Sequence, residues 1–326
     1  MGSKLLMEQI LSHFPQKHLK YAFAYGSGVF QQHGNLETSK NMIDFVFAVD
    51  NPVQWHSENM INNRSHYSVL SRFGPKYISY IQDNHGARVY YNTLVSCEGR
   101  LIKYGVISTR SLINDLLDWE TLYVSGRLHK PVTELLHGQS DSDLSKALVA
   151  NLQSAIHTAL LLLPEQFSEE ELFATIAGLS YTGDFRMTIG EDRNKVISIV
   201  RPNVGNFRKL YELHILNSKH LQWDKSKGML QQSDDPASRY HHLNLLPKWL
   251  MFAVVNVCNS DGRHRDTEEV LRSLAKDSEC REVVEGCVSS IVKYSSLSQS
   301  AKGILTAGFL KSVKYSFKKL KKMLKI

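Results

Sequence analysis

The stretch Tyr21-Ala-Phe-Ala-Tyr-Gly-Ser-Gly28 decides the fold, because an apolar and aromatic run ends there in a glycine-rich turn. Such a run predicts a buried strand, and the Gly-Ser-Gly sequence predicts a tight turn at its end. The apolar run of residues 42–49 predicts a second strand, in which Asp44 stands between Ile43 and Phe45. A carboxylate in an apolar strand is costly unless it is paired or binds a metal ion. Asp44 is therefore a candidate metal ligand.

A glycine turn followed by a strand carboxylate is what a nucleotidyltransferase of the polymerase-beta type needs. Gly26 and Gly28 let the backbone approach a triphosphate, and the Ser27 hydroxyl and backbone N–H groups bind phosphate oxygens. Asp44 would hold Mg2+, which neutralises charge on the leaving diphosphate. By itself, Gly-Ser-Gly also fits an ordinary turn between a strand and a helix. Val46 stands where this superfamily usually has a second acid, so the second metal ligand is not identified.

The rest of the N-terminal half predicts further strands and helices around the same sheet. Residues 53–85 have a helical pattern that is interrupted at Gly74-Pro75. Residues 87–95 and 101–108 predict a hairpin, and residues 111–125 predict a helix. These elements indicate an α+β fold with a mixed sheet.

The pattern becomes helical from residue 143 onward. Ser168 and Glu171 predict a capping box at the start of a helix, and the polar residues 218–240 predict a loop or small hairpin. The expected organisation is a nucleotidyltransferase domain (1–138), a mostly helical domain (139–300) and a C-terminal helix (301–326).

The formal net charge of +7 belongs to one segment. Residues 302–326 contain eight lysines and no Asp or Glu, so the first 301 residues carry a formal charge of about −1. This near-neutral body argues against a nucleic-acid-binding face and favours a local electrostatic contact. The four cysteines have no CxxC spacing, which is typical of reduced thiols. No apolar run reaches the roughly 18 residues that a transmembrane helix needs.

The lysine-rich C-terminal segment also has an apolar stripe. Val313, Phe317, Leu320 and Leu324 recur at helical spacing, with lysines on the other faces. This pattern predicts a helix in an anionic membrane interface, where each lysine contributes about 1 kcal/mol. A solvated basic tail and a helix docked on the domain are the alternatives. The predicted membrane-binding residues are Lys311, Lys314, Phe317, Lys318, Lys319, Leu320, Lys321, Lys322 and Leu324.

Longer motifs occur along nearly the whole chain. They are Phe23-Ala-Tyr-Gly-Ser-Gly-Val-Phe30, Asp44-Phe-Val-Phe-Ala-Val-Asp50, Pro52-Val-Gln-Trp-His56, Ser65-His-Tyr67, Tyr90-Tyr-Asn92, Ile102-Lys-Tyr-Gly-Val-Ile107, Leu122-Tyr-Val-Ser-Gly-Arg-Leu128, Lys130-Pro131 and Gly183-Asp-Phe-Arg186. In these motifs the chain closely resembles the mitochondrial CDP-diacylglycerol synthases, which are the phosphatidate cytidylyltransferases of the translocator assembly and maintenance family.

The resemblance implies transfer of CMP from CTP to phosphatidic acid with Mg2+, which yields CDP-diacylglycerol and diphosphate. It also implies a peripheral position on the matrix side of the mitochondrial inner membrane, where the product feeds cardiolipin synthesis. The implied fold is a nucleotidyltransferase domain joined to a mostly helical, winged-helix-like domain.

The same resemblance suggests roles for particular residues. Tyr25 and the Gly26-Ser27-Gly28 turn bind the nucleotide phosphates, and Ser27, Asp44 and Lys103 are the candidate catalytic residues. Lys103 lies in an apolar strand and contacts the triphosphate or phosphatidate, or else reaches water from a strand edge. Arg127 and Lys130 clamp phosphate, or else belong to a charged loop between the domains.

Two further pairs are interpreted as structural. Asp184 and Arg186 are expected to form an ion pair at the domain interface, although a catalytic role stays open. The adjacent His241 and His242 are interpreted as ordinary surface or loop histidines, because they lack partners at metal-binding spacing.

Two other functions remain open. Nucleotidyl transfer to RNA or to a small metabolite would use the same fold, although the near-neutral body counts against RNA. A non-catalytic membrane scaffold that supports inner-membrane protein assembly is the other, and Val46 in place of an acid is its best support.

Overall fold

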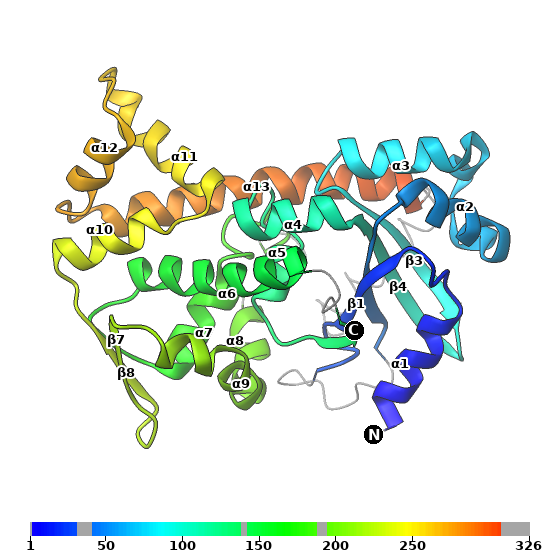
Figure 1. The fold of residues 1–326 in the computed structure, drawn as a ribbon, viewed down its shortest axis with the longest axis horizontal. Coiled ribbons are helices and arrows are strands. Elements are labelled where there is room, and N and C mark those ends of the chain that lie inside the picture. The colour runs from blue at the N-terminus through cyan, green and yellow to red at the C-terminus, as the bar shows by residue number, and fades with distance from the viewer. Residues whose placement is uncertain (1, 31–40, 138–141, 188–193, 308–326) are drawn as a thin grey trace.

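The computed structural model describes residues 2–30, 41–137, 142–187 and 194–307. They form an α+β molecule in which a five-stranded sheet lies beside a larger group of helices (Figure 1). The predicted fold class is thereby confirmed. None of the described helices combines the length and the apolar character needed to span a membrane.

The sheet has the strand order β3-β4-β2-β1-β5. Its strands are β1 (Leu19–Tyr25), β2 (Ile43–Val49), β3 (Val89–Cys97), β4 (Arg100–Ser108) and β5 (Thr133–Leu136). β2 and β4 are parallel, whereas the other neighbouring pairs are antiparallel. The predictions of both first strands and of the hairpin are confirmed.

Each face of the sheet is covered by its own group of side chains. Helix α1 (Gly2–Ser12) and Trp55 of α2 (Pro52–Asn62) pack against the face that carries Phe45 and Phe47. The opposite face carries Phe23 and Val46 and packs against α4 (Thr109–Asp118). Because side chains alternate along a strand, Asp44 belongs to this second face.

Two predicted helices are shorter than the sequence suggested. The segment 53–85 forms α2 and α3 (Gly74–Asn84), separated by short 3-10 turns. The helix predicted for 111–125 ends at Asp118, because Trp119 adopts a left-handed conformation with φ 53° that closes the helix. A separate short helix, α5 (Ser125–Leu128), follows.

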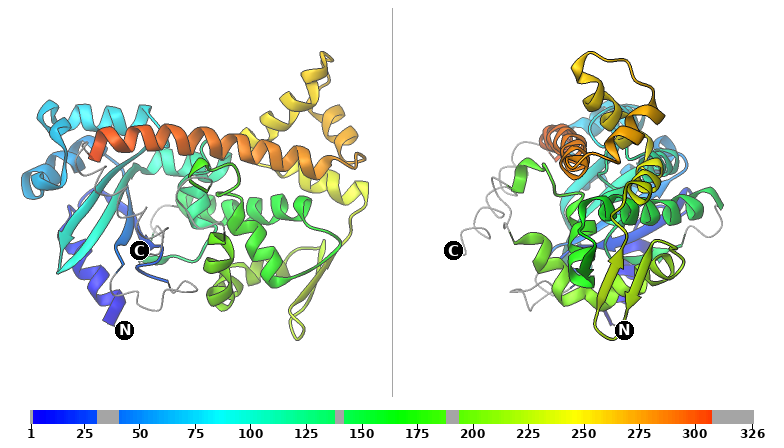
Figure 2. Two further views of the ribbon diagram at one scale, coloured as in Figure 1. Left: turned by 180° about the vertical axis from the view of Figure 1, so that it is seen from behind. Right: turned by 90° about the vertical axis from the view of Figure 1, so that its left-hand side faces the viewer.

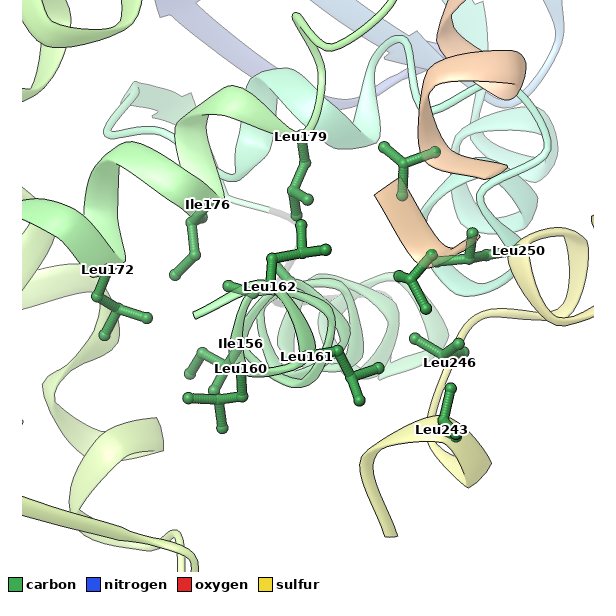
Figure 3. Packing of buried hydrophobic residues seen from close by; sticks show 14 of the residues in the cluster. Ile156, Leu160, Leu161, Leu162, Leu172, Ile176, Leu179, Leu243, Leu246 and Leu250 are labelled. Atoms are coloured by element: carbon green, nitrogen blue, oxygen red, sulfur yellow. The ribbon is translucent and has the colours of Figure 1, made fainter. Parts of the chain in front are cut away.

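The remaining helices pack around α6 (Ser142–Leu162), whose apolar side chains lie at the centre of the larger core (Figure 3). The capping box at Ser168 is confirmed, and so is a hairpin within 218–240. The other elements are β6 (Gln166–Ser168), α7 (Glu169–Gly178), α8 (Lys195–Val200), α9 (Val204–Leu216), β7 (Leu221–Asp224), β8 (Met229–Gln232), α10 (Pro236–Asn244), α11 (Lys248–Cys258), α12 (Thr267–Leu274) and α13 (Cys280–Ala307).

Helix α13 joins the helical group to the sheet and runs past residue 300 without a break (Figure 2). Gln299 donates to the carbonyl of Val89 at 3.3 Å, and its Oε1 accepts from the Ala87 amide at 2.9 Å. Lys302 is buried and donates to the carbonyls of Gln82 and His85 at 3.0 and 2.8 Å. Lys302 is therefore part of the packed interior, although the sequence analysis grouped it with the other lysines of residues 302–326. The predicted membrane-binding residues, Lys311 to Leu324, lie outside the described residues.

Candidate nucleotide site

The turn after β1 is built around Gly26. The amides of Val29 and Phe30 both donate to the Gly26 carbonyl, at 3.0 and 2.9 Å. Gly26 has a φ of 83°, a conformation that favours glycine. Asn41 holds the other side of the turn by donating to the Ser27 carbonyl at 3.1 Å. The residues of the turn are only partly buried.

Asp44 lies directly against this turn. A Cβ atom built on Gly26 would stand 3.2 Å from Asp44 Oδ2, so a side chain there would crowd the carboxylate. Gly28 is constrained more severely, since a Cβ atom would lie 2.4 Å from the Met42 carbonyl oxygen. The glycines therefore let the turn approach β2, and the structure brings turn and carboxylate together.

Three predicted site residues form a row across the sheet. Tyr25 lies opposite Asp44 in the β1–β2 register, and Asp44 lies opposite Lys103 in the β2–β4 register. Residues that are directly paired point to the same face of a sheet. Val46, two residues further along this face, is fully buried in an apolar cluster and is no metal ligand.

Tyr91 underlies Lys103 because its neighbour on β4 is Gly105. A Cβ atom on Gly105 would lie 2.5 Å from the Tyr91 ring, so only glycine lets the ring cross β4. The Lys103 Nζ lies 4.2 Å from the centre of that ring. A cation over an aromatic face is attracted by the ring. This contact favours a Lys103 side chain held over the sheet face rather than one extended into water.

Arg127 reaches the same row from α5. Its Nε donates to the Tyr25 hydroxyl at 3.2 Å, and its Nη1 donates to the Tyr123 carbonyl. The guanidinium also lies 3.8 Å from the centre of the Tyr123 ring. Tyr25 and Tyr123 thereby orient the cation toward the strand that carries Asp44.

Tyr123 marks the centre of a group of positive charges that the sequence did not reveal. Burial of its hydroxyl raises the pKa, but the charges of Arg127, Arg186 and Lys103 together lower that pKa to about 8. A cation favours the ionised form of a neighbouring tyrosine only at short range. The charges of three cations from three separate segments therefore act on Tyr123.

Asp115 shapes the loop that presents Tyr123. Its Oδ1 accepts from the amides of Thr121 and Leu122 at 2.9 and 3.0 Å and from the Thr121 hydroxyl at 2.7 Å. Its Oδ2 accepts from the amides of Val124 and Ser125 at 3.1 and 2.9 Å. This buried carboxylate is saturated by the loop backbone, so its role is to position the loop.

The helical group holds the other side of α5. Asn151 on α6 donates to the Ser125 carbonyl at 3.1 Å and accepts from Trp119 Nε1 at 2.9 Å. A Cβ atom on Gly126 would lie 2.4 Å from Ser180 Cβ, so the segment after α7 packs directly on α5. These contacts between the helical group and α5 therefore fix where Arg127 lies relative to the sheet.

Lys130 lies at the junction between the two halves. Its Nζ donates to the Ser180 hydroxyl at 2.8 Å and to the Gly126 carbonyl. Burial, followed by the charge of Arg127, lowers its pKa to about 7. A phosphate that bound nearby would raise the pKa of Lys130, because an anion stabilises the charged ammonium.

Asp184 and Arg186 form the ion pair that the sequence suggested. Arg186 Nε donates to both carboxylate oxygens of Asp184, at 2.9 and 3.0 Å. The Asp184 side chain is almost fully buried, whereas Arg186 is partly exposed. The charge of Arg186 also lowers the pKa of Tyr123, so the pair links the helical group to the loop that carries Tyr123.

The donor set beside the turn fits a hard cation. Mg2+ commonly takes one or two carboxylates and completes its shell with water and substrate phosphates. Asp44 supplies such an oxygen next to the Gly26 turn. Asp50, at the far end of β2, accepts from Thr109 and pairs with Lys20 at 3.1 Å. Asp50 therefore does not supply the second ligand.

Comparison with known proteins gives one consistent result. The family model described as phosphatidate cytidylyltransferase, mitochondrial, matches residues 7–322. The protein of that name from Xenopus laevis is 52% identical over 99% of this chain and 96% of its own length. The Mus musculus protein is 50% identical over 98% and 94%, and the Caenorhabditis elegans protein is 43% identical over 97% and 98%.

Proposed function

The chain belongs to the family of mitochondrial phosphatidate cytidylyltransferases, and from this premise we propose the reaction that its site performs. CMP passes from CTP to phosphatidic acid, and CDP-diacylglycerol and diphosphate are the products. The observation that carries this proposal is the row of Tyr25, Asp44 and Lys103 beside the Gly26 turn, with Arg127 bonded to Tyr25.

The acceptor in this reaction needs no strong general base. A phosphate oxygen of phosphatidate attacks the α-phosphorus of CTP, and the bond from that phosphorus to the bridging β-phosphate oxygen breaks. The attacking oxygen is already anionic, so no proton has to be removed from it. Positioning and neutralisation of charge therefore supply most of the catalysis.

The residues of the chain divide this work between them. The backbone amides and the Ser27 hydroxyl of the turn hold phosphate oxygens. Lys103 in the row and Arg127 beside it neutralise the two anions that must meet there. Tyr25 keeps the Arg127 guanidinium in place through its hydroxyl.

A divalent ion, which we take to be Mg2+, would be held by Asp44 together with substrate phosphates. When bound, it supplies charge neutralisation on the phosphates during the transfer. Asp44 is the residue of the described chain that we assign to it, because its Oδ2 lies against the phosphate turn.

The location follows from the acceptor. The relatives are named mitochondrial, and phosphatidic acid is an anionic membrane lipid. We place the enzyme peripherally on the matrix side of the inner membrane, attached by the lysine-rich segment from Lys311 to Leu324. Its product would then enter cardiolipin and phosphatidylglycerol synthesis in that membrane.

One assay tests the proposed reaction. Purified protein is incubated with Mg2+, labelled CTP and liposomes that contain or lack phosphatidic acid. Labelled CDP-diacylglycerol should form only when phosphatidic acid and Mg2+ are both present. CTP turnover into another product would indicate a different acceptor, and absence of any turnover would favour the non-catalytic scaffold.

Membrane attachment is tested separately from catalysis. The variant with Lys318, Lys319, Lys321 and Lys322 replaced by Gln should sediment poorly with anionic liposomes. Its turnover of phosphatidate dispersed in detergent should match that of the wild type. Unchanged sedimentation of this variant would contradict the proposed role of the segment.

A further inference from the structure

Four histidines gather on the helical group, at the end of α6 and the start of the β7 hairpin. They are His157 of α6, His220 before β7, and His241 and His242 of α10. The interpretation as a surface residue holds for His241, which is exposed, but was wrong for His242. Both lie on a helix, and His242 is only 2% exposed. Their partners come from distant segments, which a search for metal spacing in the sequence does not detect.

The side chains of His157, His241 and His242 present nitrogen atoms to one another. One ring nitrogen from each lies within 4.8 Å of those of the other two. The Nδ1 atoms of His157 and His242 are 2.9 Å apart. Tetrahedral Zn2+ sites with metal–nitrogen distances near 2.0–2.1 Å need nitrogens roughly 3.4 Å apart. The spacing of the three nitrogens is therefore close to that of a coordinating set.

His242 is not satisfied by its surroundings. Its Nε2 is buried and has no hydrogen-bond partner within the part of the chain that the structure describes. A buried polar atom without a partner is costly. The Nδ1 contact with His157 satisfies only one of the two ring nitrogens. Within the described residues, this nitrogen is therefore available to a bound ligand.

The three rings are also in the protonation state that metal binding needs. Burial, followed by the neighbouring imidazoles, lowers the pKa of His157 to about 4 and that of His242 to about 3. Burial and His220 lower the pKa of His241 as well. Neutral imidazoles keep a nitrogen lone pair for coordination. His220 stacks on the His241 ring, with the ring centres 4.1 Å apart, and limits its rotation.

We propose that His157, His241 and His242 form a binding site for a divalent transition-metal ion, with Zn2+ as the best fit. Imidazole donors suit Zn2+, Cu2+ and Ni2+, whereas Mg2+ prefers oxygen ligands. The site is therefore distinct in chemistry from the one at Asp44. It does not depend on the proposed reaction, since no residue is shared.

The ion would link α6 and α10, which already pack together in the larger core. His157 lies on the same helix as Asn151, which holds the Ser125 carbonyl beneath Arg127. A cation between α6 and α10 would hold α6 at His157, further along the helix than Asn151. Its expected effect is greater thermal stability of the whole chain.

The experiment measures Zn2+ binding by the chelator-treated full chain with isothermal titration calorimetry. The wild type should bind one Zn2+ per chain, and His241→Gln should weaken binding about 10- to 100-fold or more. His241 is exposed, so this variant should fold normally. His264→Gln is the matched control, because His264 is exposed on the helical group and lies outside the cluster.

Two further measurements test the coordination of the ion and its effect on stability. Co2+ bound to the wild type should give the intense visible absorption of a four-coordinate site, and His157→Gln should lose it. Zn2+ should raise the melting temperature of the wild type and of His264→Gln, but not that of His241→Gln. Equal Zn2+ binding by the wild type and His241→Gln, or no stoichiometric binding by the wild type, would overturn the proposal.

Discussion

The two halves of the nucleotide site are built in different ways. The first half consists of Tyr25, Asp44 and Lys103, which stand side by side on three paired strands. The second half consists of Arg127 and Arg186, which reach the site from a loop helix and from the helical group. Backbone register places the first half, whereas tertiary contacts place the second.

This difference predicts different sensitivities. Residues on paired strands keep their places as long as the sheet forms, so substitutions there should remove chemistry and leave stability intact. Arg127 depends on Asp115, Asn151 and Ser180 for its position. Substitutions among these supports should therefore change stability and activity together.

The largest effect is expected for Asp44→Asn on the strand half. Loss of the carboxylate should lower turnover of CTP by about 10³-fold, because the metal ion loses its charged ligand. CDP-diacylglycerol formation measures the loss, and the melting temperature should stay near that of the wild type. Asp50→Asn, at the other end of the same strand, is the control and should keep most of its activity. Full activity of Asp44→Asn would remove Asp44 from the site.

The second effect concerns Arg127 on the other half. Arg127→Gln should lower kcat/KM for CTP by about 10²-fold, since one preorganised positive charge is lost. Arg127→Lys should restore little, because its ammonium cannot bond to Tyr25 and Tyr123 at once. Arg110→Gln, an exposed arginine on α4, serves as the control. Rescue by Lys would show that charge alone, without orientation, is sufficient.

The third effect concerns Asp115, which holds the loop that precedes Arg127. Asp115→Asn places an amide group among backbone N–H donors and should lower the free energy of unfolding by about 3 kcal/mol. Urea denaturation measures the change, and kcat should fall as well, because the loop carries Tyr123. Asp118→Asn at the end of the same helix should be nearly neutral. A variant as stable as the wild type would refute the positioning role.

The smallest effect concerns Lys302, which is buried where α13 packs against the sheet and lies away from the nucleotide site. Burial lowers the pKa of Lys302 to about 7, whereas an unfolded lysine titrates near 10.4. Between these values the unfolded chain binds more protons than the folded one, so stability from this group rises with pH. The free energy of unfolding of the wild type relative to Lys302→Met should increase by up to about 1.4 kcal/mol per pH unit above pH 7.

The matched variant for this measurement is Lys293→Met, because Lys293 is exposed on the same helix. Its difference from the wild type should be independent of pH between 7 and 9. A flat difference for Lys302→Met over the same range would show that the buried amine keeps its ordinary pKa.

Local sequence accounts for the strand half of the site. The apolar runs predicted β1 and β2, and the glycine turn predicted the place where a phosphate can approach. Asp44 was identified from its cost in an apolar strand, whereas Lys103 was suggested by the resemblance to the family. The structure does not supply a second metal ligand at position 46, because Val46 packs in the core.

The predicted helix boundary was wrong where a side chain fixes the conformation of backbone several residues away. The pattern of residues 111–125 is helical throughout, but Trp119 turns left-handed and the Asp115 carboxylate binds the following amides. Tyr123 carried no sign of its role for the same reason, because its neighbours Arg186 and Lys103 come from other segments. His242 was misread because its partner His157 lies on another helix.

The sequence by itself determined four of the five strands, the phosphate turn and the carboxylate beside it, because apolar runs and the need for glycine are local properties. It also located the net positive charge in residues 302–326. It did not indicate β5. Only the tertiary structure decided which cations face Asp44, that Lys302 is buried, and that four histidines meet. These outcomes depend on packing between segments distant in sequence, and local periodicity does not encode such contacts.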